Sequence, residues 1–155
     1  MICTLKLSTF NGFFAFTAFR YNQHIYNRRN NKEDIFKEEK NYQFFLDRFQ
    51  KYLISWVDVH AYCLMPNHFH FLIRVKDLSE EQQAQLEYQF KNFFISYAKA
   101  INKAYSRTGS LFQYKFKRKE IESEPQYGLN IAYIHFNPVK VGLYATCEAW
   151  KYSSY

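Results

Sequence analysis

The chain has few cysteines, and their positions do not predict a disulfide framework or a structural zinc site. Cys3, Cys63 and Cys147 are odd in number and widely separated, and no Cys-x-x-Cys pair occurs. We therefore expect a reducing, cytoplasmic location. The chain also lacks the roughly 18 uninterrupted apolar residues of a membrane span, so no membrane partner is expected.

Internal repeats, low-complexity tracts and interdomain linkers are also missing, and a chain of 155 residues then predicts one domain. We expect this domain to cover residues 21–155. Residues 1–20 are expected to form an N-terminal extension or an uncertain strand. Their Phe-rich run faintly resembles a signal peptide, but the extension or strand is the preferred interpretation.

Positive charge and aromatic side chains are plentiful. The formal net charge is +7, and aromatic residues make up 21% of the chain. Such a charge favours a polyanionic partner or an anionic membrane surface. Many aromatic residues lie among basic ones, a mixture that suits stacking on nucleobases better than contact with lipid.

A predicted hairpin at the centre of the chain contains two closely spaced histidines. Odd positions from 57 to 63 are apolar, Pro66-Asn67 supplies a turn, and alternation resumes after it. His68 and His70 should then share one face of a strand, roughly 6 to 7 Å apart. Two such imidazoles can reach one metal ion. They can equally be polar residues on a solvated face, and the spacing leaves both readings open.

Elements on either side of the hairpin predict the fold class. A first strand is expected over residues 21–27, and a helical stripe runs from Tyr42 to Leu53. A capping box at Ser79-Glu80-Glu81-Gln82 starts a long helix that continues to about residue 105. A last helix should begin near Pro125 and end before Pro138. This order predicts an α+β protein, an antiparallel sheet with helices packed on it in a ferredoxin-like arrangement.

The segment from Leu111 to Lys119 alternates aromatic and basic residues, so we expect a strand with one aromatic and one basic face. Lysines commonly protect a solvated edge strand. With the overall positive charge, a groove that follows a phosphate backbone is an equally good interpretation.

Tyr133 and Asn137 lie one turn apart on the predicted last helix and should face the same way. Taken alone this pattern is weak, because most of the 14 tyrosines should serve packing. His24, His60 and His135 are isolated in the sequence and are interpreted as surface or hydrogen-bonded residues.

Three ordered motifs carry a resemblance to a known family. They are the hairpin segment Tyr62–His70, the segment Gly109–Gln113 with its basic strand, and Tyr133–Lys140. Together they resemble the HUH single-tyrosine transposases, in particular the REP-associated tyrosine transposases, over roughly residues 21–155. A zinc deaminase would need a Glu beside the histidine and a Pro-Cys-x-x-Cys, which are missing. An RNP signature of an RNA-binding sheet is missing as well.

The resemblance implies an HUH nuclease fold and a transposase, a metal-dependent single-strand DNA endonuclease and strand transferase. His68, His70 and Asn137 would bind one divalent ion, Mg²⁺ or Mn²⁺, and Tyr133 would be the nucleophile. The partner would be single-stranded or hairpin DNA, and the enzyme would act as a homodimer. The residues expected to contact the DNA backbone are basic: Lys115, Lys117, Arg118, Lys119 and Lys140.

The sequence also departs from the family pattern. Arg29 stands in a loop where relatives usually have a glycine, and the first 19 residues have no counterpart in relatives. The chain ends at Tyr155, where relatives commonly continue, so a C-terminally truncated copy is one expectation. The alternative function is a catalytically decayed protein of the same fold that still binds DNA hairpins.

Overall fold

A four-stranded antiparallel sheet forms the centre of the protein. The computed structural model describes residues 22–29, 34–113 and 115–155, so the expected N-terminal extension lies outside the described residues. The strands are β1 (Asn22–Arg28), β2 (Val57–Met65), β3 (His68–Val75) and β4 (Lys117–Glu120). Their spatial order is β2-β3-β1-β4, and every neighbouring pair is antiparallel.

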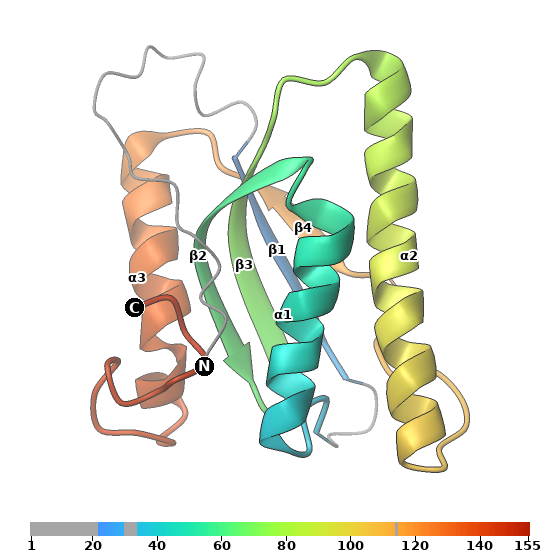
Figure 1. Ribbon diagram of the computed structural model, residues 1–155. Coiled ribbons are helices and arrows are strands. Elements are labelled where there is room, and N and C mark those ends of the chain that lie inside the picture. Colours follow the sequence, from blue (N-terminus) through green and yellow to red (C-terminus); the bar gives the residue numbers. More distant parts are fainter. Residues whose placement is uncertain (1–21, 30–33, 114) are drawn as a thin grey trace.

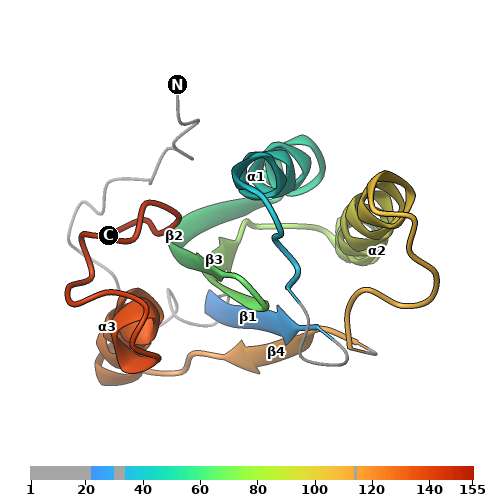
Figure 2. The ribbon, with the colours of Figure 1, turned by 90° about the horizontal axis from the view of Figure 1, so that it is seen from below.

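Three helices cover the sheet from both sides. They are α1 (Glu39–Leu53), α2 (Glu80–Ala104) and α3 (Glu124–Lys140). Helices α1 and α2 lie over one face, and α3 lies over the other (Figure 1, Figure 2). The chain order β-α-β-β-α-β-α is the predicted one, and the α+β fold class is confirmed. In the part of the chain that the structure describes, every helix is too short or too polar to cross a membrane.

Aromatic rings form a connected layer in the core beneath α1 and α2, beside aliphatic residues such as Leu46 and Ile73. Phe49 of α1 stacks on Phe71 of β3 with ring centroids 4.4 Å apart, and Phe45 contacts Phe69 at 5.1 Å. Phe93 of α2 completes the layer against Phe45. Offset and edge-on ring pairs of this kind add to the stabilisation from burying apolar area. This layer fixes β3, so residues on the opposite face of β3 point toward α3.

Side-chain caps at the N-termini of α1 and α2 explain where these helices begin. Ser79 caps α2, its Oγ accepting from the Gln82 N–H while the Gln82 side chain accepts from the Ser79 N–H, which confirms the predicted capping box. Glu38 and Asn41 form a similar reciprocal pair at α1. These contacts satisfy backbone N–H groups that have no partner within the helix.

Strand β2 contains a bulge that the apolar alternation did not predict. Val59 lies opposite Ile73 and Ala61 lies opposite Leu72, with a register shift between them. Directly opposed residues point to the same side of a sheet. The expectation that Val57, Val59, Ala61 and Cys63 share one face is therefore wrong, because the extra residue at His60 turns the later two toward α3.

The basic segment is a strand only at its end, and the predicted strand from Leu111 is wrong in its bounds. Lys115 has φ +63°, which a strand cannot have, and β4 begins at Lys117. Before it, Phe112 forms an isolated bridge with Arg29 and packs on Phe94 with centroids 5.3 Å apart. The aromatic residues expected on one face of a strand thus lie instead in an irregular segment that packs against α2. Tyr114, which was expected in the same strand, lies outside the described residues.

Pro138 does not end the last helix, which continues to Lys140. Proline removes one backbone donor and disfavours helical backbone in the residue before it. Here Asn137 stays helical, and its side-chain Nδ2 donates to the Tyr133 carbonyl at 2.8 Å. The Val141 N–H then bonds the Asn137 carbonyl. These bonds stabilise the turn around the proline, so the expected end before Pro138 is wrong by three residues.

The segment after α3 returns along the outer edge of β2. The Leu64 N–H donates to the Tyr152 carbonyl at 2.9 Å, and the Ser154 N–H donates to the Tyr62 carbonyl at 3.0 Å. Trp150 is buried, and its indole N–H donates to the Leu64 carbonyl at 3.0 Å. An exposed sheet edge would offer unpaired backbone groups, and this tail pairs those of Tyr62 and Leu64 near the end of β2.

Candidate functional site

The two histidines of β3 lie side by side beneath α3. His68 and His70 point to the same face, as predicted, with ring centroids 5.2 Å apart and planes at 84°. Their cross-strand partners on β1 are Arg28 and Tyr26. His70 is 6% exposed, whereas His68 is nearer the surface. The face opposite the aromatic layer thus carries a polar row along β1 and β3.

Both imidazoles use Nδ1 in a side-chain hydrogen bond. His68 Nδ1 lies 2.6 Å from Asn67 Oδ1, and His70 Nδ1 lies 2.9 Å from Nε2 of His24. Burial lowers the pKa of His68 and of His70, with the charges of His24, His68 and Lys140 acting in the same direction on His70. The rings are therefore neutral near pH 7, and a neutral imidazole has one bare nitrogen.

Helix α3 brings Tyr133 and Asn137 to these histidines. The Tyr133 ring stands edge-on to His70, with centroids 5.5 Å apart, and is 41% exposed. Asn137 is buried and lies near His68, and its proximity acts to raise the His68 pKa against the larger lowering effect of burial. The Nδ2 of Asn137 is held by the Tyr133 carbonyl, so its amide oxygen is the atom left for another partner. The predicted pair on α3 therefore meets the predicted pair on β3.

The donor set fits one divalent cation. Nδ1 of His68 is bonded to Asn67, so its Nε2 is the nitrogen available to a cation, and the Asn137 amide oxygen is a further electron-pair donor near this ring. Two imidazoles and one oxygen, with room for water or phosphate, suit Mn²⁺ or Mg²⁺ better than a closed structural zinc site. Among the described residues no cluster of three His, Cys, Asp or Glu side chains is placed for a metal; an amide oxygen is outside that set and is a ligand type that hard cations accept.

A cavity of about 330 Å³ opens beside the histidines. Its lining comes from β1, β3, β4, α3 and the segment before β4: Tyr26, Asn27, Arg28, His68, His70, Gln113, Lys117 and Tyr133. A second cavity of about 640 Å³ shares Arg28, His68 and Gln113 with the first and extends past the β2–β3 turn. The shared residues make the two cavities neighbours, and the lining of the second combines polar side chains with apolar ones such as Met65 and Leu143.

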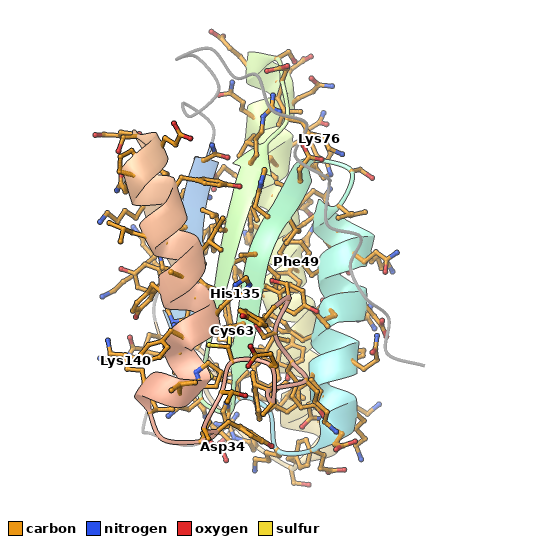
Figure 3. The ribbon with its side chains drawn as sticks, turned by 90° about the vertical axis from the view of Figure 1, so that its left-hand side faces the viewer. Asp34, Phe49, Cys63, Lys76, His135 and Lys140 are labelled. Carbon is orange, nitrogen blue, oxygen red and sulfur yellow. The ribbon has the colours of Figure 1, made fainter. Side chains whose placement is uncertain are left out.

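The basic residues expected to bind DNA are divided between the two faces. Lys117 and Lys119 lie opposite Tyr26 and His24 in the sheet, on the face that carries the histidines. Lys140 Nζ lies 5.2 Å from the centroid of the Tyr133 ring (Figure 3 labels Lys140 at the end of α3). Arg118 points to the α2 side, where its guanidinium bonds Glu87 at 2.6 Å.

Lys115 is exposed just before β4, outside the strand in which it was expected. Its role in binding DNA, like the roles of the other basic residues, stays a prediction.

Sequence reasoning did not place His24 at the site. It was interpreted as isolated, yet it is 6% exposed and contacts His70 and the Tyr133 ring. Alternating polar residues along β1, from Asn22 through His24 and Tyr26, were the available signal, but they do not reveal the neighbouring strand. His60 and His135 are hydrogen-bonded as expected, to Tyr127 Oη at 2.6 Å and to Ser154 Oγ at 3.0 Å.

The chain is similar to proteins of one family in sequence and in fold. A Haemophilus influenzae protein named as a REP-associated tyrosine transposase is 26% identical over 100 residues, which cover 61% of this chain. The match spans 57% of that relative's length, somewhat more than half. The solved structure of a REP-associated tyrosine transposase bound to a REP hairpin has a TM-score of 0.63 at 18% identity, covering 96% of this chain and 83% of that one. No protein-family model matches the chain.

Proposed function

We propose, from the confirmed resemblance of this chain to the REP-associated tyrosine transposases, that it cleaves and rejoins single-stranded DNA beside hairpins. One observation carries the proposal. Tyr133 of α3 lines one open cavity together with the imidazoles of β3, and Asn137 lies near His68, although the two elements are far apart in the sequence. A nucleophile next to a site for a divalent cation is the arrangement that phosphodiester cleavage requires.

In the proposed reaction the phenolate oxygen of Tyr133 attacks the scissile phosphorus. The new Tyr133 O–P bond replaces the P–O3′ bond, the phenol proton passes to solvent, and the departing 3′ oxygen takes up a proton as a free 3′-OH. A 3′-OH can later attack the phosphotyrosine, which restores a phosphodiester and releases the phenol. Each step exchanges one phosphoester bond for another, so no external energy source is needed.

The chain's own residues would hold the cation as well as the DNA. His68 and His70 would use Nε2, and Asn137 its amide oxygen. When bound, Mg²⁺ or Mn²⁺ would polarise a phosphate oxygen and stabilise the charge that develops on the 3′ oxygen. The rigid aromatic layer behind β3 keeps both imidazoles in place, which limits reorganisation during the reaction.

DNA would enter along the two connected cavities. Lys117 of β4 lines the first cavity, and Arg28 lines both. Lys119 lies on the same face of β4, and Lys140 of α3 lies beside the Tyr133 ring. Cations so placed can follow a phosphate backbone. The hairpin DNA bound by the structural relative makes a hairpin with single-stranded arms the substrate that we propose. A homodimer and a cytoplasmic location complete the proposal.

The test is covalent capture of DNA. Purified protein is incubated with Mn²⁺ and a panel of labelled hairpin oligonucleotides with single-stranded arms, taken from imperfect palindromes that flank the gene. We expect a denaturation-resistant adduct with the wild type and none with Tyr133→Phe. Tyr88→Phe is the matched control, because Tyr88 is an exposed tyrosine of α2 on the other side of the sheet.

The same assay separates the active enzyme from the decayed hairpin-binding protein. The double variant His68→Ala with His70→Ala should lose the adduct and keep its affinity for the hairpin. An adduct that persists in Tyr133→Phe would show that the nucleophile is another residue. Hairpin binding without any adduct in the wild type would favour the decayed protein. Light scattering on the same samples tests for the homodimer.

A further inference from the structure

The larger cavity beside His68, of about 640 Å³, has a lining of two kinds. Its volume falls within the roughly 300 to 1,000 Å³ that ligand sites in proteins occupy. The residues that it shares with the smaller cavity are polar: Arg28, His68 and Gln113. Among the described residues that line only the larger cavity, four are apolar: Met65, Pro66, Val141 and Leu143. The proposed chemistry takes place at the shared residues and gives the apolar part of this cavity no role.

Val141 and Leu143 are apolar side chains at the surface of the protein. They are 54% and 45% exposed, and both line the larger cavity. Exposed apolar side chains that border a concave surface are typical of ligand sites. Leu129 of α3 is 71% exposed but lines neither cavity. Val141 and Leu143 therefore differ from Leu129 in having a concave surface to share with a ligand.

Backbone hydrogen bonds hold the apolar part of the lining in place. In the segment after α3, the Leu143 N–H donates to the Pro138 carbonyl at 3.0 Å. At the β2–β3 turn, the Pro66 carbonyl accepts from two N–H groups, that of Ile35 at 2.7 Å and that of Phe36 at 3.0 Å. A cavity with such a lining is formed before the ligand arrives, so less conformational entropy is lost on binding.

The charged side chains of the lining limit what the ligand can be. Arg28 is exposed and lines both cavities, so it can pair with a phosphate beside His68. Arg29 is buried, and its Nη1 donates to the Asp34 carbonyl at 2.6 Å. Asp34 lines only the larger cavity, where its carboxylate would repel a phosphate but can accept from the amino group of a base. A ligand with a phosphate at one end and a flat, mostly apolar ring at the other meets both conditions.

Gln113 offers a group that can distinguish one base from another. Its backbone is fixed to β1, because its N–H donates to the Arg28 carbonyl at 2.9 Å and its carbonyl accepts from Asn27 Nδ2 at 3.4 Å. Gln113 lines both cavities. A glutamine amide carries a donor and an acceptor side by side, a pair that can hydrogen-bond the edge of a base.

We propose that the larger cavity binds one unpaired nucleobase of the DNA strand, from a nucleotide next to the scissile phosphate. The base would lie against Val141, Leu143 and Pro66. Its edge would meet Gln113, and its phosphate would stay beside Arg28. Enzymes that act on nucleic acids hold an extruded base in such a pocket. The choice of DNA as the ligand rests on the proposed function, and the pocket adds to it a preference for the base at one position.

The position of the pocket would also align the strand with the nucleophile. Val141 and Leu143 follow directly after α3, the helix that carries Tyr133. A base held against these two side chains would therefore be fixed relative to the same helix as the phenol. Holding the reacting groups in one geometry lowers the entropic part of the barrier.

The direct test is binding of hairpin oligonucleotides in the presence of EDTA, so that no cleavage interferes. Single abasic sites are placed in turn along the single-stranded arms, and affinity is measured by fluorescence anisotropy. We expect one arm position at which loss of the base weakens binding about tenfold, as loss of a well-placed apolar contact does. 2-Aminopurine at that position should become brighter on binding, because a base removed from its stacked neighbours is less quenched.

Variants then place that base in the cavity. Leu143→Ala should weaken binding of the intact oligonucleotide about tenfold and leave the affinity for the abasic one unchanged, because the lost contact is made to the base. Gln113→Ala should flatten the preference among the four bases at that position. Leu129→Ala is the matched control, since Leu129 is an exposed leucine outside both cavities, and it should bind as the wild type does.

The possible results separate the pocket from the proposed cleavage. Equal affinity for all the abasic oligonucleotides would overturn the pocket, even in a protein that forms the covalent adduct. A loss in Leu143→Ala that is the same for intact and abasic oligonucleotides would also overturn it. The expected base-dependent affinity in a protein that forms no adduct would support the pocket and count against cleavage.

Discussion

The two faces of the sheet are built on different principles. Beneath α1 and α2, stacked rings such as Phe49 and Phe71 exclude water. Beneath α3, hydrogen-bonded imidazoles, Asn137 and a cavity take their place. Figure 3 shows Phe49 on the α1 side of the sheet and Lys140 at the far end of α3. The aromatic face supplies rigidity, and the polar face uses that rigidity to hold side chains that could not orient one another in water.

The largest expected effect comes from breaking the aromatic face. Phe49→Ala should lower the free energy of unfolding by about 3 to 5 kcal/mol, because it leaves a cavity among packed rings. Phe136→Ala is the matched substitution on α3, where Phe136 is 51% exposed, and it should change stability little. Urea unfolding followed by circular dichroism measures both. Equal losses would mean that α3 is packed as tightly as α1.

A substitution at the outer edge of β2 should lower the free energy of unfolding by less than Phe49→Ala does. Trp150→Phe keeps most of the ring but leaves the Leu64 carbonyl without its indole donor. We expect a loss of about 1 to 3 kcal/mol from the unsatisfied buried group, again measured by urea unfolding. Tyr144→Phe, which alters a more exposed ring beside Trp150, should be close to neutral; a similar loss there would show that the tail acts through general packing.

The division of charge between the faces predicts a difference in DNA binding. Lys117→Ala and Lys119→Ala remove cations from the histidine face, and each should reduce the salt dependence of single-strand binding by about 0.7 in the log–log slope. Arg118→Ala removes an equal charge that is paired with Glu87 on the other face. It should leave the slope nearly unchanged. Fluorescence anisotropy at several salt concentrations tests the contrast, and equal slopes for all three variants would refute it.

The smallest effect concerns pH. Burial lowers the pKa of His60, with Arg74 acting in the same direction and Asp58 against it, while Tyr127 of α3 holds the ring. The unfolded chain therefore binds a proton more readily near the ordinary pKa of about 6.5. Stability should be full above that pH and fall as the pH drops through it.

His60→Gln should make the free energy of unfolding fall less steeply with decreasing pH. The change in slope should be smaller than that for one bound proton. Urea midpoints at pH 7.5 and 5.5 would show the difference, which a slope unchanged by the substitution would contradict. The remaining slope should come from the other buried imidazoles, most of which lie on the polar face.

The sequence alone determined the features that depend on neighbours along the chain. The capping box at Ser79, the stripe of α1 and the shared face of His68 and His70 follow from helical and strand periodicity. Tyr133 and Asn137 are four residues apart, so on a helix they lie on the same side. These features are local, so backbone geometry and the alternation of apolar residues are enough to predict them.

Only the tertiary structure decided how these pieces meet. The register of β1 against β3 puts His24 on His70, the bulge at His60 turns half of β2 over, and the positive φ of Lys115 confines the basic strand to its last residues. The β1–β3 register joins segments distant in the chain, and a shift of a strand by one residue moves its side chains to the other face. The sequence therefore predicted the candidate ligands and nucleophile, and the packing of the sheet supplied the partners that orient them.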